Sequence, residues 1–182
     1  MTVDSHERLV HLLKQLSYRR MRVTLASGRE SDFYVDGKQT TLNAEGAWLV
    51  GNLIFDALSP DIVGIGGLVV GADPVAAATA AVSFHRGRPI HAFLVRKEAK
   101  GHGTLRYVEG RQNLPAGSKV CVVEDTVTTG TSLLNAVERC RAEGLDVVQA
   151  LTIVDREEGG AEAIRATGLP FTALVRRAEL EG

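Results

Sequence analysis

Residues 120–140 read VCVVEDTVTTGTSLLNAVERC. An apolar run ends at Glu124 and Asp125, a turn of hydroxyl-bearing residues around Gly130 follows, and the chain resumes as an amphipathic helix. A continuous apolar run that leads through a short turn into a helix is typical of a strand buried inside a parallel sheet. The stretch therefore indicates an α/β fold.

The alternation of apolar runs with helical patterns extends over most of the chain. Apolar runs lie at 61–67, 89–95, 119–125, 146–155 and 170–175, and helical patterns at 73–87, 130–144 and 159–168. This order predicts an open, mainly parallel sheet with helices on both faces. Upstream, the sequence predicts a helix over 5–17 with Ser5 as N-cap, two short strands around Ser27–Arg29, and a helix over 44–58. We expect a single domain over residues 1–182, with a small hood-like addition over about residues 1–42.

Composition and charge exclude several classes of protein. A chain of 182 residues, 45% of them hydrophobic, is long enough for one domain with a substantial core. The formal net charge of −1 gives no reason to expect nucleic acid or a membrane as a partner. Cys121 and Cys140 lack the spacing of metal ligands, which favours a reducing cytoplasm over a disulfide framework. The charged, amphipathic N-terminal segment is neither a secretory signal nor a membrane span.

The segment EDTVTTGTS, residues 124–132, lies beyond the carboxyl end of a predicted strand, where open parallel sheets bind ligands. Its hydroxyl groups, its glycine and the start of the next helix suit a phosphate group. Glu124 and Asp125 would repel that phosphate, but they can accept hydrogen bonds from the vicinal hydroxyls of a sugar. These features predict a site for a ribose 5-phosphate. A helix terminus with hydroxyl caps stays open as the plainer alternative, whereas the P-loop and GxGxxG patterns are absent.

The same segment resembles the phosphoribosyl-diphosphate (PRPP) motif of the type I phosphoribosyltransferases, which have the fold predicted above. In that family the segment binds PRPP, and the second acid takes part in catalysis, which corresponds to Asp125. The resemblance implies the following PRPP-binding residues: Glu124, Asp125, Thr126, Val127, Thr128, Thr129, Gly130, Thr131 and Ser132. It also implies that Thr128 contacts the base.

A second polar stretch, RKEAKGHGT at 96–104, follows another predicted strand at the same edge of the sheet. By itself it is either a solvated basic turn or a cationic loop suited to a pyrophosphate leaving group. It closely resembles the catalytic loop of the orotate phosphoribosyltransferases. The resemblance implies PRPP contacts from Arg96, Lys97, Lys100 and His102, with Lys100 the most important for catalysis. It further implies a homodimer in which the loop, residues 96–110, reaches into the neighbouring subunit's site.

Two more segments extend the resemblance to the base site. VDREEGG at 154–160 matches the segment whose arginine contacts orotate, so Arg156 is expected to bind the orotate carboxylate. LASGRESDFYVD at 25–36 matches the segment that packs against the pyrimidine, with Tyr34 and Val35 at the matching positions. Without the resemblance, Arg156 reads as an exposed turn residue, and Tyr34 and Val35 as part of a half-buried strand.

The chain departs from the family pattern at two places where many members carry a lysine. It has Ala26 before Ser-Gly-Arg, and the segment 66–74 reads GGLVVGADP. The resemblance still implies orotate phosphoribosyltransferase activity with Mg²⁺, which is held mainly through PRPP rather than by a protein metal site. The alternatives are transfer to another base, or a PRPP-sensing regulator on the same fold. A regulator fits less well because the chain has no added DNA-binding module and no strongly basic face.

Overall fold

The structure, a computed structural model that describes residues 4–24, 30–98 and 107–182, is built on a six-stranded sheet. The strands of this sheet are β3 (Gly64–Leu68), β4 (His91–Val95), β5 (Val108–Glu109), β6 (Lys119–Val127), β7 (Asp146–Asp155) and β8 (Phe171–Arg176). Their spatial order is β5-β4-β3-β6-β7-β8, and every neighbouring pair is parallel except β4 and β5. The predicted mainly parallel sheet is therefore confirmed.

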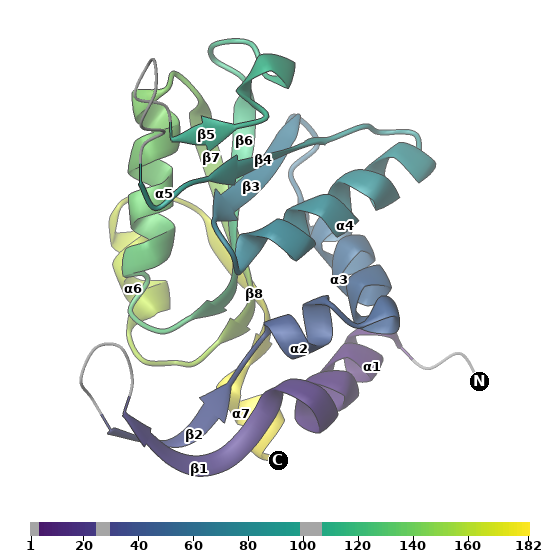
Figure 1. The fold of residues 1–182 in the computed structure, drawn as a ribbon, viewed down its shortest axis with the longest axis vertical. Helices are drawn as coiled ribbons and strands as arrows, with labels where there is room; N and C mark the ends of the chain where they lie inside the picture. The colour runs from purple at the N-terminus through teal and green to yellow at the C-terminus, as the bar shows by residue number, and fades with distance from the viewer. Residues whose placement is uncertain (1–3, 25–29, 99–106) are drawn as a thin grey trace.

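Helices cover both faces of the sheet (Figure 1). They are α3 (Ala44–Ala57), α4 (Ala72–His85), α5 (Thr131–Ala142) and α6 (Gly160–Ala166). Alternate residues of β6 enter two separate hydrophobic clusters, as expected for a strand buried on both sides. Cys121 and Val123 belong to the cluster that includes α3 and α4, whereas Val120 and Val122 belong to the cluster that includes α5 and α6.

The N-terminal addition, which we call the hood, is formed by residues 4–24 and 30–41. Its elements are α1 (Ser5–Leu12), a π-helical turn (Leu13–Ser17), the antiparallel strands β1 (Tyr18–Thr24) and β2 (Glu30–Val35), and α2 (Lys38–Thr41). The predicted helix over 5–17 and the predicted strand pair are present. The predicted N-cap Ser5 is wrong by one residue, because the side chain of Asp4 accepts the hydrogen bond from His6 N at 3.2 Å.

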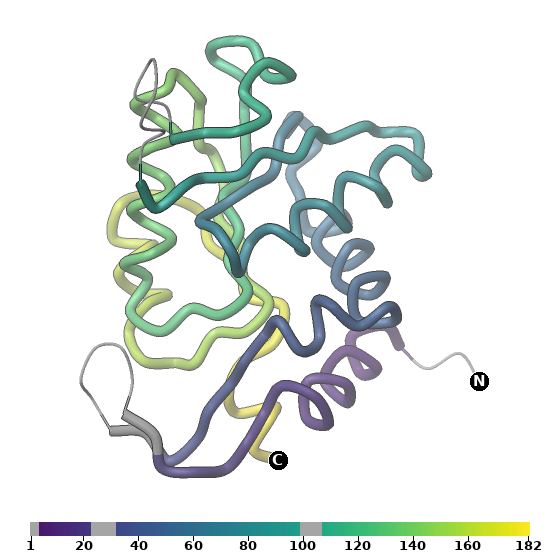
Figure 2. The backbone as a smooth tube through the Cα atoms, viewed as in Figure 1, coloured from purple at the N-terminus to yellow at the C-terminus, as the bar shows by residue number. Residues whose placement is uncertain are grey.

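The last helix, α7 (Arg177–Glu181), returns the end of the chain to the hood (Figure 2). Arg177 forms an ion pair with Asp32 of β2 at 3.2 Å. The imidazole Nε2 of His6 lies within hydrogen-bonding distance of the Leu174 carbonyl, at 2.9 Å. The hood is therefore held by contacts from β8 and α7, near the C-terminal end of the chain.

Three short elements were not expected from the sequence: β5, α2 and α7. β5 has two residues and lies inside the polar stretch 96–117, which has little apolar periodicity. Its backbone is held by pairing with β4 and by a hydrogen bond to Glu143 of α5. Neither contact can be predicted from the sequence around β5. Such elements depend on tertiary contacts rather than on propensity.

Both cysteines are buried and free. Burial raises the pKa of the Cys121 thiol, and burial with the nearby Glu143 raises the pKa of the Cys140 thiol to about 12. Neither thiol is therefore a ready nucleophile near neutral pH. Within the described part of the chain, no helix is both long enough and apolar enough to cross a membrane.

Candidate active site

The switch point of the sheet lies between β3 and β6. From β3 the chain passes through α4 to β4 on one side, whereas β6 pairs with the other side of β3. In open α/β sheets, ligands bind outside the carboxyl ends of the strands at this position. The predicted segment 124–132 begins at the carboxyl end of β6, so the structure places it at the switch point.

The two acids of this segment lie in the last part of β6. Asp125 is 9% exposed and accepts a hydrogen bond from Thr126 N at 2.9 Å. Burial raises the pKa of the Asp125 carboxyl, and the nearby Lys38 opposes that shift. Burial, with a smaller contribution from Asp125, raises the pKa of Glu124 to about 8. A sugar that donates hydroxyl hydrogen bonds would restore part of the solvation that both groups lose.

The backbone packs closely around Asp125 because two glycines lie against it. A Cβ on Gly71, between β3 and α4, would lie 2.4 Å from Asp125 Oδ1, and a Cβ on Gly37 of the hood would lie 3.0 Å from Asp125 Oδ2. Real Cβ atoms do not approach other atoms as closely as the first distance. Side chains at Gly71 are therefore excluded while Asp125 keeps this position.

The residues 128–132, which we call the phosphate loop, connect β6 to α5. Gly130 has φ +79° and is the N-cap of α5, so no side chain caps the first N–H groups of this helix. The hydroxyl oxygens of Thr129 and Thr131 lie 3.0 Å apart, which indicates a hydrogen bond between them. Free amides, a helix N-terminus and hydroxyl groups together make an anion-binding loop.

The side-chain groups of two predicted PRPP-binding residues, Val127 and Thr126, are buried. Val127 is fully buried in the hydrophobic cluster under α5 and α6, so it can contribute only through its backbone, whose carbonyl already accepts from Arg156 N at 3.0 Å. The Thr126 hydroxyl is buried and has no hydrogen-bond partner among the described residues.

Arg156 directly follows β7 and is 3% exposed, so the exposed-turn interpretation is wrong. Its guanidinium forms an ion pair with Glu158 at 2.9 Å and donates to the Phe33 carbonyl at 3.4 Å. The guanidinium carbon also lies 4.3 Å from the centroid of the Phe33 ring. Arg156 is thus a buried, oriented cation beside the hood, as binding of a carboxylate would require.

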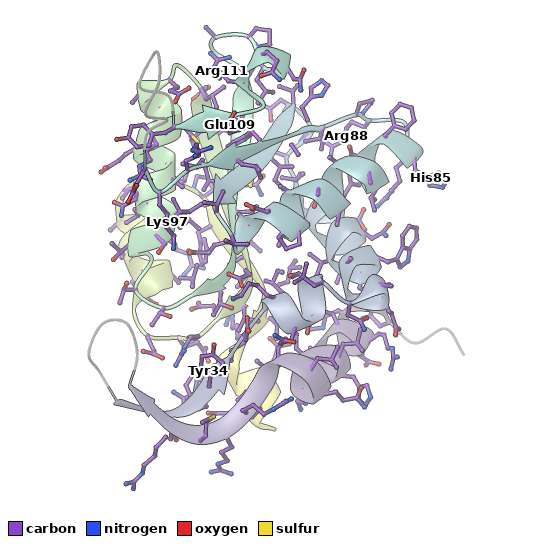
Figure 3. All side chains as sticks on the ribbon, viewed as in Figure 1. Tyr34, His85, Arg88, Lys97, Glu109 and Arg111 are labelled. Carbon is purple, nitrogen blue, oxygen red and sulfur yellow. The ribbon has the colours of Figure 1, made fainter. Side chains whose placement is uncertain are left out.

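The two predicted pyrimidine contacts of β2 have different environments. Tyr34 is 40% exposed, and Figure 3 shows it on the hood. Val35 is 6% exposed and belongs to the cluster under α3 and α4, so its side chain is committed to the core. Phe33 lies on the same side of β2 as Val35 and was missed, although strict alternation along the strand could have indicated its burial.

The cationic stretch is described only at its beginning. Arg96 and Lys97 follow β4 and are exposed, and Arg96 forms an ion pair with Glu109 of β5 at 3.1 Å. Figure 3 labels Lys97 and Glu109. Together with Val69, Leu94 and Glu98 they line a hollow of about 380 Å³. Lys100 and His102 lie outside the described residues, as does Ala26.

The two ends of this stretch are tied to each other and to α5. Arg96 N donates to the Tyr107 carbonyl at 2.8 Å. Arg139 of α5 donates to the Arg96 carbonyl at 2.5 Å, and its guanidinium carbon lies 4.6 Å from the Tyr107 ring centroid. Glu143 of α5 accepts from Tyr107 N at 2.5 Å and from Val108 N at 2.9 Å. The helix that starts at the phosphate loop therefore also holds the base of the cationic stretch.

Lys38, the first residue of α2, is a cation that sequence reasoning missed. Its ammonium lies 2.7 Å from Asp36 Oδ1 and 3.9 Å from Asp125 Oδ2. The hydrogen bond to Asp36, together with the charge of Asp125, raises the pKa of the ammonium, so Lys38 stays charged at neutral pH. Only the packing of the hood against β6 brings Lys38 to Asp125.

Comparison with known families and proteins gives a consistent result. The family model described as the phosphoribosyl transferase domain matches residues 66–166. A protein of Sorangium cellulosum named orotate phosphoribosyltransferase is 51% identical over 96% of this chain and 92% of its own length. A protein of the same name from a Nostoc species is 45% identical over 96% of this chain and 84% of its own length.

Solved structures agree in fold over nearly the whole chain. Orotate phosphoribosyltransferase of Mycobacterium tuberculosis in complex with Fe(III) dicitrate has a TM-score of 0.84 at 45% identity, covering 97% of this chain and 98% of that one. The same enzyme in complex with 5-phospho-α-D-ribosyl 1-diphosphate has a TM-score of 0.80 at 41% identity, covering 98% and 99%.

Proposed function

The chain belongs to the orotate phosphoribosyltransferase family, and we propose how its residues divide the work of the family's reaction. That reaction transfers a 5-phosphoribosyl group from PRPP to N1 of orotate and yields orotidine 5′-monophosphate and pyrophosphate. The observation that carries the proposal is that three features lie at the same edge of the sheet. They are the acid pair, the phosphate loop, and Arg156, which is buried and stacks on Phe33 of the hood.

The sugar phosphate is held by the segment 124–132. Glu124 and Asp125 accept hydrogen bonds from the ribose hydroxyls, and the phosphate loop with the first turn of α5 binds the 5-phosphate. This division matches the electrostatics, because the acids lie in β6 whereas the phosphate loop precedes a helix N-terminus. Thr126 and Val127 contribute through their backbone.

The base is held between the phosphate loop and the hood. Arg156 binds the orotate carboxylate, Tyr34 stacks on the ring, and Thr128 contacts the base from the loop. Val35, whose side chain packs in the core, contacts the base through its backbone. Residues of about 1–42 thus serve the base site within one domain over 1–182.

Glycosyl transfer of this kind passes through a cation-like sugar, and orotate already carries a negative charge. The protein therefore needs to position the reactants and to stabilise charge on the leaving pyrophosphate. Arg96, Lys97, Lys100 and His102 supply that stabilisation, with Lys100 the most important. Closure of their segment over the site would exclude water from PRPP.

Mg²⁺ fits this site as a companion of PRPP. Among the described residues, no group of three or more His, Cys, Asp or Glu side chains could hold a metal ion. Oxygen atoms of PRPP and water molecules would supply most ligands, and Glu124 and Asp125 would assist from β6. When bound, Mg²⁺ neutralises charge on the diphosphate.

A cytoplasmic homodimer that shares the segment 96–110 between subunits completes the proposal. It rests on the family resemblance and is supported by Leu42, Trp48 and Phe84, which are large apolar side chains exposed on or next to α2, α3 and α4. Mixing Lys100→Ala chains with Asp125→Asn chains should restore part of the activity through one intact composite site. No complementation would exclude the shared site.

The direct test of the function is the fall in orotate absorbance when purified protein is mixed with PRPP and Mg²⁺. We expect consumption that requires all three components and drops at least about a hundredfold in Lys100→Ala. PRPP binding without orotate consumption would instead indicate another base or a regulator.

A further inference from the structure

Lys38 stands where the hood meets the ribose acids. Its ammonium lies 3.9 Å from Asp125 Oδ2. Lys38 is therefore placed near the residue proposed to accept from the sugar, and it follows Tyr34, the residue proposed to stack on the base, by four positions in the chain.

The segment 66–74 cannot supply a cation at this point. It contains no lysine or arginine, and Gly71, its residue nearest to Asp125, has no room for a side chain because a Cβ would lie 2.4 Å from Asp125 Oδ1. At the other carboxylate oxygen, Gly37 brings the hood backbone close to Asp125, with a Cβ 3.0 Å from Oδ2, and leads directly into Lys38. The cation next to this carboxylate therefore comes from the hood, because the segment 66–74 carries none.

The contacts of Lys38 leave it able to bind an anion. Its short hydrogen bond to Asp36 uses one of three ammonium donors, the distance to Asp125 is too long for a hydrogen bond, and 42% of its side chain is exposed. The charge balance also calls for a cation, because Asp36 and Asp125 are acidic and PRPP is a polyanion.

We propose that Lys38 binds the diphosphate of PRPP from the hood and replaces the cation that the segment 66–74 lacks. The inference rests on the proposed function and adds a diphosphate contact to it. It also links the two halves of the site, since the same short segment carries Tyr34 for the base and Lys38 for the leaving group.

The test is calorimetric binding of inorganic pyrophosphate and of PRPP, each with Mg²⁺, to the full chain and to Lys38→Gln. We expect both ligands to bind about tenfold more weakly to the variant, because a hydrogen bond to a charged group is lost. Lys38→Arg should stay within about threefold of the unmodified chain. In the absorbance assay, the KM for PRPP should rise in Lys38→Gln while the KM for orotate changes less than about twofold.

Lys119 provides a matched control. Its ammonium also lies 2.7 Å from an aspartate, Asp61, with 48% of the side chain exposed, but it belongs to the amino end of β6. Lys119→Gln should leave the binding of both ligands unchanged. An equal loss in Lys119→Gln and Lys38→Gln would overturn the proposal.

Asp36→Asn distinguishes a role of Lys38 in ligand binding from a purely structural role of its ion pair with Asp36. It breaks the short Lys38 ion pair but keeps the ammonium, so pyrophosphate should bind at least as tightly as before. Weakening equal to that of Lys38→Gln, or unaltered binding in Lys38→Gln, would refute the proposal. Because these arms measure pyrophosphate and PRPP binding, they decide the role of Lys38 even if the chain fails to consume orotate.

Discussion

The guanidinium carbon of Arg156 lies 4.3 Å from the centroid of the Phe33 ring, which joins the carboxyl end of β7 to strand β2 of the hood. Arg177 of α7 lies over the same ring at 4.0 Å. Phe33 is therefore contacted by two cations, one proposed to bind substrate and one in the C-terminal helix. The orientation of Arg156, which we propose binds orotate, thus depends on a buried aromatic ring of the hood.

Phe33→Leu should weaken orotate binding, because it removes the aromatic ring on which Arg156 rests. We expect the KM for orotate to rise about tenfold and the KM for PRPP to change less than about twofold. Stability should fall by about 1–2 kcal/mol, since Phe33 is buried. Steady-state kinetics and thermal unfolding would measure both effects.

Phe171→Leu is the control for that change. Phe171 is 7% exposed and also carries an arginine, Arg165, with its guanidinium carbon 5.5 Å from the ring centroid, but it lies at the amino end of β8. A similar loss of stability with an unchanged KM for orotate is expected. If both variants raise the KM equally, Phe33 acts only through general stability.

Arg156→Lys should lower kcat/KM for orotate by about a hundredfold, because an ammonium cannot make the two parallel hydrogen bonds of a guanidinium to a carboxylate. PRPP binding measured by calorimetry should stay within about twofold. Retention of most activity in this variant would exclude Arg156 as the carboxylate-binding residue.

Glu158→Gln tests the ion pair that holds Arg156 at 2.9 Å. The change removes an anion that competes with the orotate carboxylate, so orotate should bind about threefold more tightly. The ligand-free protein should melt at a lower temperature, because the buried guanidinium loses a charged partner. Weaker binding of orotate would show that Glu158 orients Arg156 rather than competes with the substrate.

Arg139→Gln should lower kcat by about tenfold, because Arg139 holds both Arg96 and Tyr107, which bracket the cationic stretch. PRPP binding should change less than kcat. Arg141→Gln is the matched change on the same helix, where the guanidinium donates to the Val147 carbonyl at 3.4 Å. Equal kinetic losses in the two variants would argue against a specific role for Arg139.

The stability of the ligand-free protein should fall as the pH rises from about 4.5 to about 8. Burial raises the pKa of Glu124 from its ordinary 4.5 to about 8, so in this range the folded state keeps a proton that the unfolded chain releases. Glu124→Gln should flatten this part of the profile in chemical denaturation experiments. Glu138→Gln, on the exposed face of α5, should keep the slope of the unmodified chain.

The sequence was most informative where strand, acid pair and phosphate loop are contiguous. The continuous apolar runs predicted β3, β4, β6, β7 and β8. These strands are apolar along their whole length because both of their faces are buried in one sheet. Glu124–Ser132 could be recognised because its residues are consecutive in the sequence. The end of one strand and the start of the next helix fix the position of the whole segment.

Residues placed by tertiary packing could not be found in this way. Phe33 and Arg156 are 123 positions apart, and their contact exists only because the hood packs on the carboxyl end of the sheet. The same packing brings Lys38 to Asp125. Val35 was assigned to the base by resemblance, although the alternation of β2 orients its side chain toward the core and leaves Tyr34 outside.

The hydrogen bond of 2.8 Å from Arg96 N to the Tyr107 carbonyl has a consequence for how the family can diversify. Because this hydrogen bond already joins the two ends of the intervening segment, the entropic cost of connecting them depends only weakly on the length of the segment. Even a doubling of that length would cost only about 0.6 kcal/mol in chain entropy. Insertions, deletions and whole-segment exchanges between relatives should therefore leave the sheet intact, so that selection can change the length and sequence of this segment separately from the stability of the sheet.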